Sequence, residues 1–181
     1  MKNELHFAVT SQAGLRGLDL SVEQLWNGGW AGRNEADVRR HIEEITAFGV
    51  PAPRTTPIWF PLSNHLATTS DRLQVLGPAS SGEIEYALLV DAAGDVYVTI
   101  ASDHSDRAME QHGIQLAKPL YPDVLAPDVW PYAEVAPHWD QLRLRCWFTR
   151  EGTRTLYPDA LASELRSADH WLAVLSEEGI R

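Results

Sequence analysis

Three acidic residues on two neighbouring predicted strands could bind a metal ion. Glu83 and Glu85 flank Ile84 in an apolar segment, and alternation along a strand sends both carboxylates to the same face. Asp103 follows the next predicted strand. If the two strands pair, three oxygen ligands converge, and such a set favours Mg²⁺, Ca²⁺ or Mn²⁺ over zinc or copper. The alternative is that Glu83 and Glu85 form the solvated face of a half-buried strand.

Further charged residues follow the same second strand. The run 96–100 is strongly β-prone, and Asp103, His104, Asp106 and Arg107 come directly after it. Charged side chains rarely cluster at the end of a strand for the sake of packing. The cluster therefore favours a binding or catalytic role for this part of the chain.

Length and charge limit the possible functions. The 181 residues suffice for one domain with a single core, which we expect to span 1–181. A formal net charge of -10 argues against nucleic acid or an anionic membrane surface as a partner. A small anionic substrate would need a local group of Arg or Lys side chains.

Cysteine content and the start of the chain predict a cytoplasmic location. The single cysteine, Cys146, cannot form an internal disulfide framework. The segment 1–5 lacks the apolar core of a signal peptide, and no apolar run is long enough to span a bilayer.

Short, regular spacing of Pro and Gly predicts an α+β domain that is mainly β. We expect strands at 6–9, 57–61, 73–76, 84–90, 96–100 and 142–148, with a hairpin turn at Gly94, and helices at 21–26, 34–48 and 159–175. Asn34 is the expected N-cap of the middle helix and Gly49 its stop. Its apolar residues keep helical spacing, as an amphipathic helix requires: Ala36, Val38, Ile42, Ile45 and Phe48.

Four segments together resemble the fumarylacetoacetate hydrolase (FAH) superfamily, in the order found there. They are Ala31-Gly32-Arg33-Asn34-Glu35-Ala36-Asp37, Gly82-Glu83-Ile84-Glu85, Ser102-Asp103-His104-Ser105-Asp106-Arg107 and Leu116-Ala117-Lys118-Pro119. Within that superfamily the chain is most similar to an uncharacterised bacterial branch. The resemblance implies a mixed β-roll core with a lid helix near the N-terminus and a C-terminal helix.

The resemblance also implies a site and a partner. A divalent cation, Mg²⁺ or Mn²⁺ with Ca²⁺ possible in crystals, would be held by Glu83, Glu85 and Asp103 in a homodimeric protein. The substrate would be a small anionic 2-oxo or 1,3-dicarbonyl acid chelated to this cation. Its binding residues would be Arg33, Arg107 and Lys118, of which Lys118 would also take part in catalysis.

Such chemistry needs a base as well as a cation. A divalent ion polarises the 2-oxo group and stabilises the enolate that forms when the neighbouring bond breaks, while a base activates water or moves a proton. The superfamily commonly uses a His-x-x-Glu pair on its lid helix, and its His aligns with Val38. His41 and Glu44 lie one turn later at an i, i+3 spacing that places them on one face. They form either this catalytic pair or a surface ion pair, and His104 is the next candidate.

Two departures from the superfamily leave two functions open. Glu110 replaces a glutamine, and the sequence given closes with Gly179-Ile180-Arg181 where a Thr-Gly-Thr-Pro segment is expected. The first function is a metal-dependent hydrolase or lyase that cleaves or decarboxylates a small oxo acid. The second is a catalytically degenerate FAH-like homodimer with a binding or structural role. The sequence does not identify the substrate.

Overall fold

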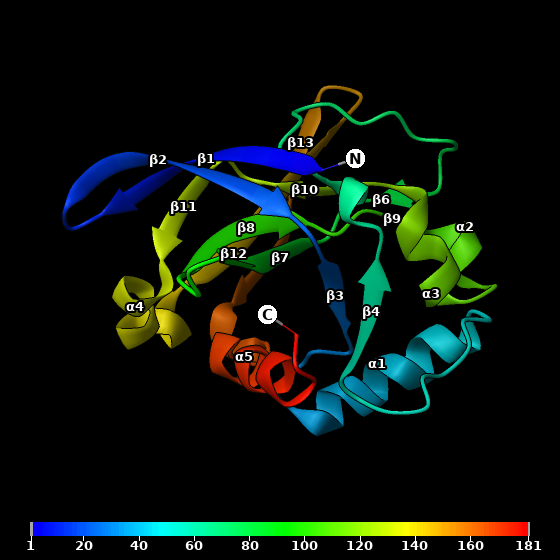
Figure 1. Cartoon of the computed structure of the whole chain (residues 1–181). Coiled ribbons are helices and arrows are strands. Elements are labelled where there is room, and N and C mark those ends of the chain that lie inside the picture. Colours follow the sequence, from blue (N-terminus) through cyan, green and yellow to red (C-terminus); the bar gives the residue numbers. More distant parts are fainter. Residues whose placement is uncertain (1, 181) are drawn as a thin grey trace.

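The computed structural model describes residues 2–180 and shows a mixed α/β fold made mainly of strands (Figure 1). The central sheet has seven strands: β1 (Asn3–Ser11), β2 (Gly14–Val22), β5 (Ala67–Thr68), β7 (Ile84–Val90), β8 (Val96–Ser102), β10 (Asp123–Leu125) and β11 (Asp128–Pro131). Their order is β2-β1-β11-β8-β10-β5, and β7 also pairs with β8. The sheet is mixed, because the β1–β11 and β10–β5 pairs are parallel and the others antiparallel.

Three two-stranded ribbons and several helices surround this sheet. The ribbons pair β3 (Leu25–Gly29) with β4 (Ile58–Leu62), β6 (Ser80–Ser81) with β9 (Ser105–Asp106), and β12 (Arg143–Arg150) with β13 (Thr153–Leu161). The α-helices are α1 (Glu35–Ala47), α2 (Arg107–Glu110), α3 (Ile114–Ala117), α4 (Tyr132–Val135) and α5 (Ala168–Glu177). Short 3-10 helices are η1 (Asn64–Leu66), η2 (Lys118–Leu120), η3 (Ala136–Gln141) and η4 (Ala162–Glu164).

Strand β8 is covered on both faces. Tyr97 packs into a core with residues of β1, β2, β7, β10 and β11, whereas its neighbour Val98 packs into a second core with Val135 and Trp139. Tyr97, Val98 and Thr99 are buried, so both faces of β8 are covered at its middle, whereas Ile100 is 47% exposed.

The predicted hairpin of β7 and β8 is confirmed. Glu85 lies opposite Ala101, and the register runs without a break to Val90 opposite Val96. Gly94 occupies the turn with a φ of +86°, a conformation that glycine adopts without steric cost. The pairing continues past β8, because the Asp103 amide donates to the Glu83 carbonyl at 3.0 Å. The condition set for convergence of the acidic residues is therefore met.

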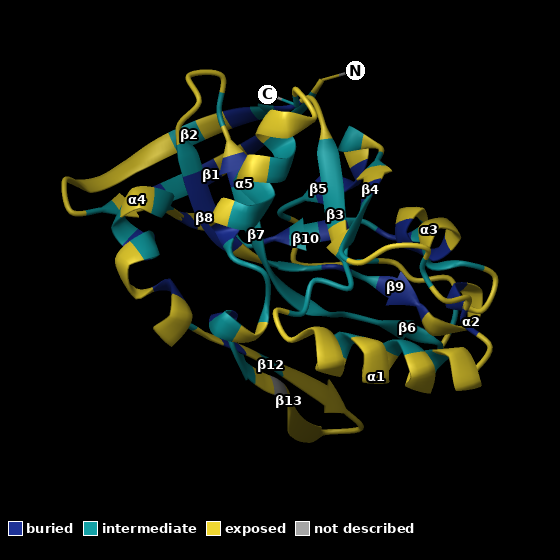
Figure 2. Cartoon of the chain, turned by 90° about the horizontal axis from the view of Figure 1, so that it is seen from below, coloured by how far each residue is buried: buried dark blue, intermediate teal, exposed yellow. Residues whose placement is uncertain are grey.

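Helix α1 begins and ends at the predicted residues, and its apolar face is only half-buried. The Asn34 side chain accepts a hydrogen bond from the Ala36 amide at 2.9 Å, and Gly49 ends the helix with a φ of +89°. None of its residues is buried, and the neighbouring Phe48 side chain is 76% exposed (Figure 2). The apolar spacing thus predicted the helix correctly, and its half-buried residues are three of the predicted apolar ones, Val38, Ile42 and Ile45.

Three other expectations about elements were wrong. Residues 21–26 are not a helix, because Ser21 pairs with Glu4 in the β1–β2 hairpin and Leu25 begins β3. Residues 73–76 form no strand. The predicted last helix is divided: Asp159 pairs with Arg145 in the β12–β13 ribbon, and α5 begins only after Ser167, whose side chain caps it. In the first and third cases, pairing with another strand outweighed the local helical pattern. In the second, the β-prone residues have no strand partner.

Among residues 2–180, none of the helices is long and apolar enough to cross a membrane.

Candidate functional site

Four carboxylates, from Glu83, Glu85, Asp103 and Asp123, form what we call the acidic cluster. Glu83 and Glu85 share a face of β7 with Leu89, which belongs to the first core. Asp103 follows β8 on the adjacent strand, and Asp123 begins β10, which pairs with the other edge of β8. Three strands of one sheet therefore bring these carboxylates together, as predicted for the first three.

Gly82 explains how the chain before β7 approaches the end of β8 so closely. A Cβ atom at this position would lie 2.8 Å from the Ser102 hydroxyl oxygen and 3.3 Å from Nδ1 of His104. A side chain here would force the side chains of Ser102 and His104 to move. Close packing therefore explains why glycine precedes Glu83 in this segment.

Lys118 is the cation buried in the cluster. Its ammonium forms a short ion pair with Asp103 and lies 3.4 Å from Oε2 of Glu83. The Lys118 side chain is 7% exposed. Burial lowers the pKa of Lys118, but the negative charges of Asp103 and Glu83 outweigh it and hold the pKa above its usual value. Lys118 is therefore charged and neutralises part of the cluster.

Asn27 joins two of the carboxylates. Its Nδ2 group donates to Oδ1 of Asp103 at 2.9 Å and to Oδ1 of Asp123 at 3.2 Å. Asp123 is 4% exposed, and its second oxygen, Oδ2, is buried with no hydrogen-bond partner among the described residues. Neither residue was predicted from the sequence.

The cluster holds more acidic groups than its lysine can neutralise. Burial, together with the charges of Glu83 and Asp103, raises the pKa of Glu85 to about 8. Burial and the nearby Asp103 raise the pKa of Asp123 to about 7. Both carboxylates are thus destabilised in their charged form, the state in which a cation binds them.

Arg107 lies at the edge of the cluster, and its role as a substrate-binding residue stays a prediction. Its guanidinium contacts Oε1 of Glu83 at 2.5 Å and Oε1 of Glu110 at 2.8 Å. Glu110 is buried and also accepts a hydrogen bond from the Ser105 hydroxyl. Asp106 has a local role, because it caps α2 by accepting from the Ala108 and Met109 amides.

The donor types fit a hard divalent cation. Buried carboxylate oxygens are the ligands that Mg²⁺ and Mn²⁺ prefer, and the unpartnered Oδ2 of Asp123 is an acceptor without a donor. Within residues 2–180, however, no three His, Cys, Asp or Glu side chains are arranged as a ready-made metal site. The Lys118 ammonium already contacts two of the carboxylates, so a cation would have to share them with it or displace it.

The predicted base lies elsewhere on the molecule. Nδ1 of His41 is 3.9 Å from Oε2 of Glu44, and both side chains are about 60% exposed on α1. The His41 ring also packs at 5.7 Å from that of Trp30. In the described part of the chain, no hydrogen bond or ion pair links α1 to the acidic cluster. The i, i+3 contact exists, but its catalytic role stays a prediction.

His104, the second candidate for the base, is closer to the carboxylates in the chain and in space. Its Nε2 atom is hydrogen-bonded to the Ser80 hydroxyl at 2.8 Å, and its ring meets that of Tyr121 edge to face. Burial lowers the pKa of His104, so the ring favours its neutral form. A neutral imidazole can accept a proton.

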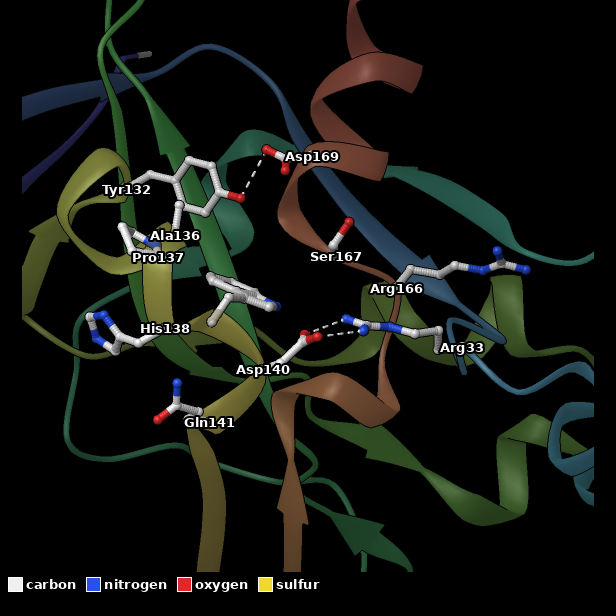
Figure 3. Close-up of a pocket in the computed structure, with 11 residues that line it drawn as sticks. Arg33, Tyr132, Ala136, Pro137, His138, Asp140, Gln141, Arg166, Ser167 and Asp169 are labelled. Carbon is white, nitrogen blue, oxygen red and sulfur yellow. Dashed lines mark hydrogen bonds and ion pairs between the residues drawn. The ribbon is translucent and has the colours of Figure 1, made fainter.

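Arg33 lies in a different place from the one implied by the resemblance. It forms two hydrogen bonds with Asp140, at 2.8 and 3.0 Å, and one with the Leu165 carbonyl. Figure 3 shows that Arg33 lines a surface pocket and directs its guanidinium at Asp140. The other residues of this pocket include Tyr132, His138, Arg166, Ser167 and Asp169. Arg33 is thus paired and is not in contact with the acidic cluster.

Comparison with known proteins identifies the family of the chain and solved structures that share its mixed-sheet fold. The chain belongs to a family of proteins of unknown function, DUF2848, whose model matches residues 28–181. No curated protein matches the chain.

Two crystal structures of Cg1458 have a similar fold. The one described as containing an inhibitor is 16% identical with a TM-score of 0.59, and the match covers 84% of this chain and 60% of that one. The other is 13% identical with a TM-score of 0.58, over 97% of this chain and 83% of that one. At these identities the likeness establishes the fold alone.

Proposed function

We propose that the protein is a divalent-metal-dependent enzyme of the FAH type that acts on a small 2-oxo or 1,3-dicarbonyl acid. The observation that supports this most is the convergence of Glu83, Glu85 and Asp103 in one cluster, in which Asp103 is buried and both glutamates are half-buried, with the buried Lys118 beside them. Buried acidic groups in such excess cost stability, and binding of Mg²⁺ or Mn²⁺ by these three residues would offset that cost.

The residues in and around the acidic cluster would have separate roles in cation binding, substrate binding and proton transfer. When bound, a divalent ion supplies a positive charge that stabilises an enolate formed by C–C bond hydrolysis or decarboxylation. Lys118 and Arg107 are the charged donors nearest to the carboxylates, and they would bind the substrate carboxylate. A proton would be taken up by His41, activated by Glu44, if α1 closes over the site, or by His104. Arg33 would then have to leave Asp140 before it could bind substrate.

A second function is favoured by one specific observation. Lys118 already neutralises Asp103 and Glu83, as a permanent structural cation would. In that case the protein is a catalytically degenerate relative that acts as a binding or structural homodimer.

The β12–β13 ribbon presents an apolar surface that a second copy would bury. Between 44% and 62% of the surface of each of its residues Trp147, Phe148 and Tyr157 is exposed. Light scattering should show a dimer.

An activity screen separates the two functions. The purified chain, with EDTA or with 1 to 5 equivalents of Mn²⁺ or Mg²⁺ in excess of EDTA, is incubated with acyl pyruvates, oxaloacetate and sugar-derived oxo acids. The enzyme function predicts turnover of at least one acid that needs the metal and is lost in Asp103→Asn. Turnover that persists in EDTA would contradict the metal-dependent mechanism, and no turnover of any acid would favour the degenerate homodimer.

A further inference from the structure

Asp123 has a carboxylate oxygen for which the surrounding protein supplies no donor. The residue is 4% exposed, and Oδ2 has no hydrogen-bond partner among residues 2–180. Most buried polar atoms in proteins are hydrogen-bonded, so each exception calls for an explanation. Among the described residues, Oδ2 of Asp123 is the fully buried oxygen of the acidic cluster that has no hydrogen-bond partner.

The donors nearby are already used. Asn27 has two Nδ2 hydrogens, and its Nδ2 group donates to Asp103 and to Oδ1 of Asp123. The Lys118 ammonium contacts Asp103 and Glu83. Asn27 therefore holds the Asp123 and Asp103 carboxylates side by side, although like charges repel one another, and leaves Oδ2 without a donor.

We infer that Asp123 is a further ligand of the divalent cation, beside Glu83, Glu85 and Asp103. This inference rests on the proposed function, because it assumes that the acidic cluster binds a cation. An anionic oxygen with no donor needs a positive charge, and a hard cation is the partner that four carboxylates would select. A fourth carboxylate raises affinity by increasing the negative charge of the ligand set.

A structural role for Asp123 makes the opposite prediction. If the residue were simply a protonated acid that donates a hydrogen bond to Asp103, asparagine would replace it, because the amide donates in the same way and has nearly the same shape. Asp123→Asn would then bind metal as the wild type does. In a ligand role the anionic oxygen strengthens binding, and the neutral amide oxygen of asparagine is a weaker ligand for a hard cation.

The test uses the full chain, stripped with EDTA and titrated calorimetrically with MnCl₂ and with MgCl₂. We expect Asp123→Asn to bind Mn²⁺ more weakly than wild type by at least the roughly 10- to 100-fold that loss of a residue supporting a metal ligand costs. Its melting temperature in EDTA should equal or exceed that of wild type, since a repelling charge has been removed. Asp71→Asn, at an exposed position, is the matched control and should change neither quantity.

The outcomes separate this inference from the proposed function. Wild-type affinity in Asp123→Asn, or in the smaller Asp123→Ala should the first variant not fold, would overturn the role of Asp123 and leave the other three ligands in place. No binding of either metal to wild type at millimolar concentration would overturn the proposed function, and this inference with it.

Discussion

The acidic cluster and helix α1 contain the two groups of residues predicted to do chemistry, and they differ most in burial. Asp103 and Lys118 are at least nine-tenths buried and in contact, whereas His41 and Glu44 are exposed and 3.9 Å apart. Charge pairs on the surface contribute roughly 0 to 1 kcal/mol and are easily formed and lost. A buried charge must be paired, so its position in the fold is determined. The cluster is thus a fixed arrangement, and the α1 pair becomes functional only if the helix closes over a ligand.

The largest effect is expected from removal of a cluster ligand. Asp103→Asn removes a charge that the cation needs, so the gain in melting temperature on addition of Mn²⁺ should vanish. Differential scanning fluorimetry with and without Mn²⁺ measures this, with Asp71→Asn as the control. A metal-dependent gain as large as that of wild type would exclude Asp103 as a ligand.

Helix α1 is tested by His41→Ala. If His41 is the base, turnover of the acid identified by the screen should fall by about two to four orders of magnitude while metal affinity stays nearly constant. His65→Ala, at another exposed histidine, is the matched control. Unchanged turnover in His41→Ala would make the pair with Glu44 a surface ion pair, and the same assay on His104→Ala would then follow.

Lys118→Ala should change both substrate binding and the thermal stability of the protein. Loss of a charge that holds the substrate in ground and transition states alike should raise KM about 10- to 100-fold, with a smaller change in kcat. It also leaves Asp103 and Glu83 without their buried cation, so the variant in EDTA should melt at a lower temperature, and Mn²⁺ should restore part of the difference. A variant with wild-type KM would show that Lys118 is a structural cation.

The smallest effect is a pH dependence specific to the cluster. The pKa of Glu85 is raised from 4.5 to about 8, so the folded protein keeps a proton that the unfolded chain releases. The stability that this proton confers is complete below about 4.5 and is lost as pH rises through about 8. In EDTA, the melting temperature of wild type relative to Glu85→Gln should therefore fall between pH 5 and pH 9. A constant difference would show that Glu85 is not buried among negative charges.

The sequence correctly predicted those features of the fold that depend on a few adjacent residues. The Glu83 and Glu85 spacing, the Gly94 turn and the Asn34 cap depend on a few adjacent residues, and the structure confirms all three. Asn27 and Asp123 could not be found in this way, since they are 96 residues apart and meet only because β3 and β10 approach the end of β8. Helical spacing predicted which side chains of α1 share the half-buried face, Val38, Ile42 and Ile45 among them, but it does not show what covers that face.

Calorimetric titration of the EDTA-stripped wild-type chain with Mn²⁺ at pH 7.5 tests the central claim most directly. The account predicts one ion bound per chain, a release of protons that makes the heat depend on the buffer used, and loss of binding in Asp103→Asn. Proton release is expected because the cation would compete with protons on Glu85 and Asp123, whose pKa values are about 8 and about 7. No heat of binding at millimolar Mn²⁺ would contradict the account and would identify Lys118 as the permanent cation of the acidic cluster.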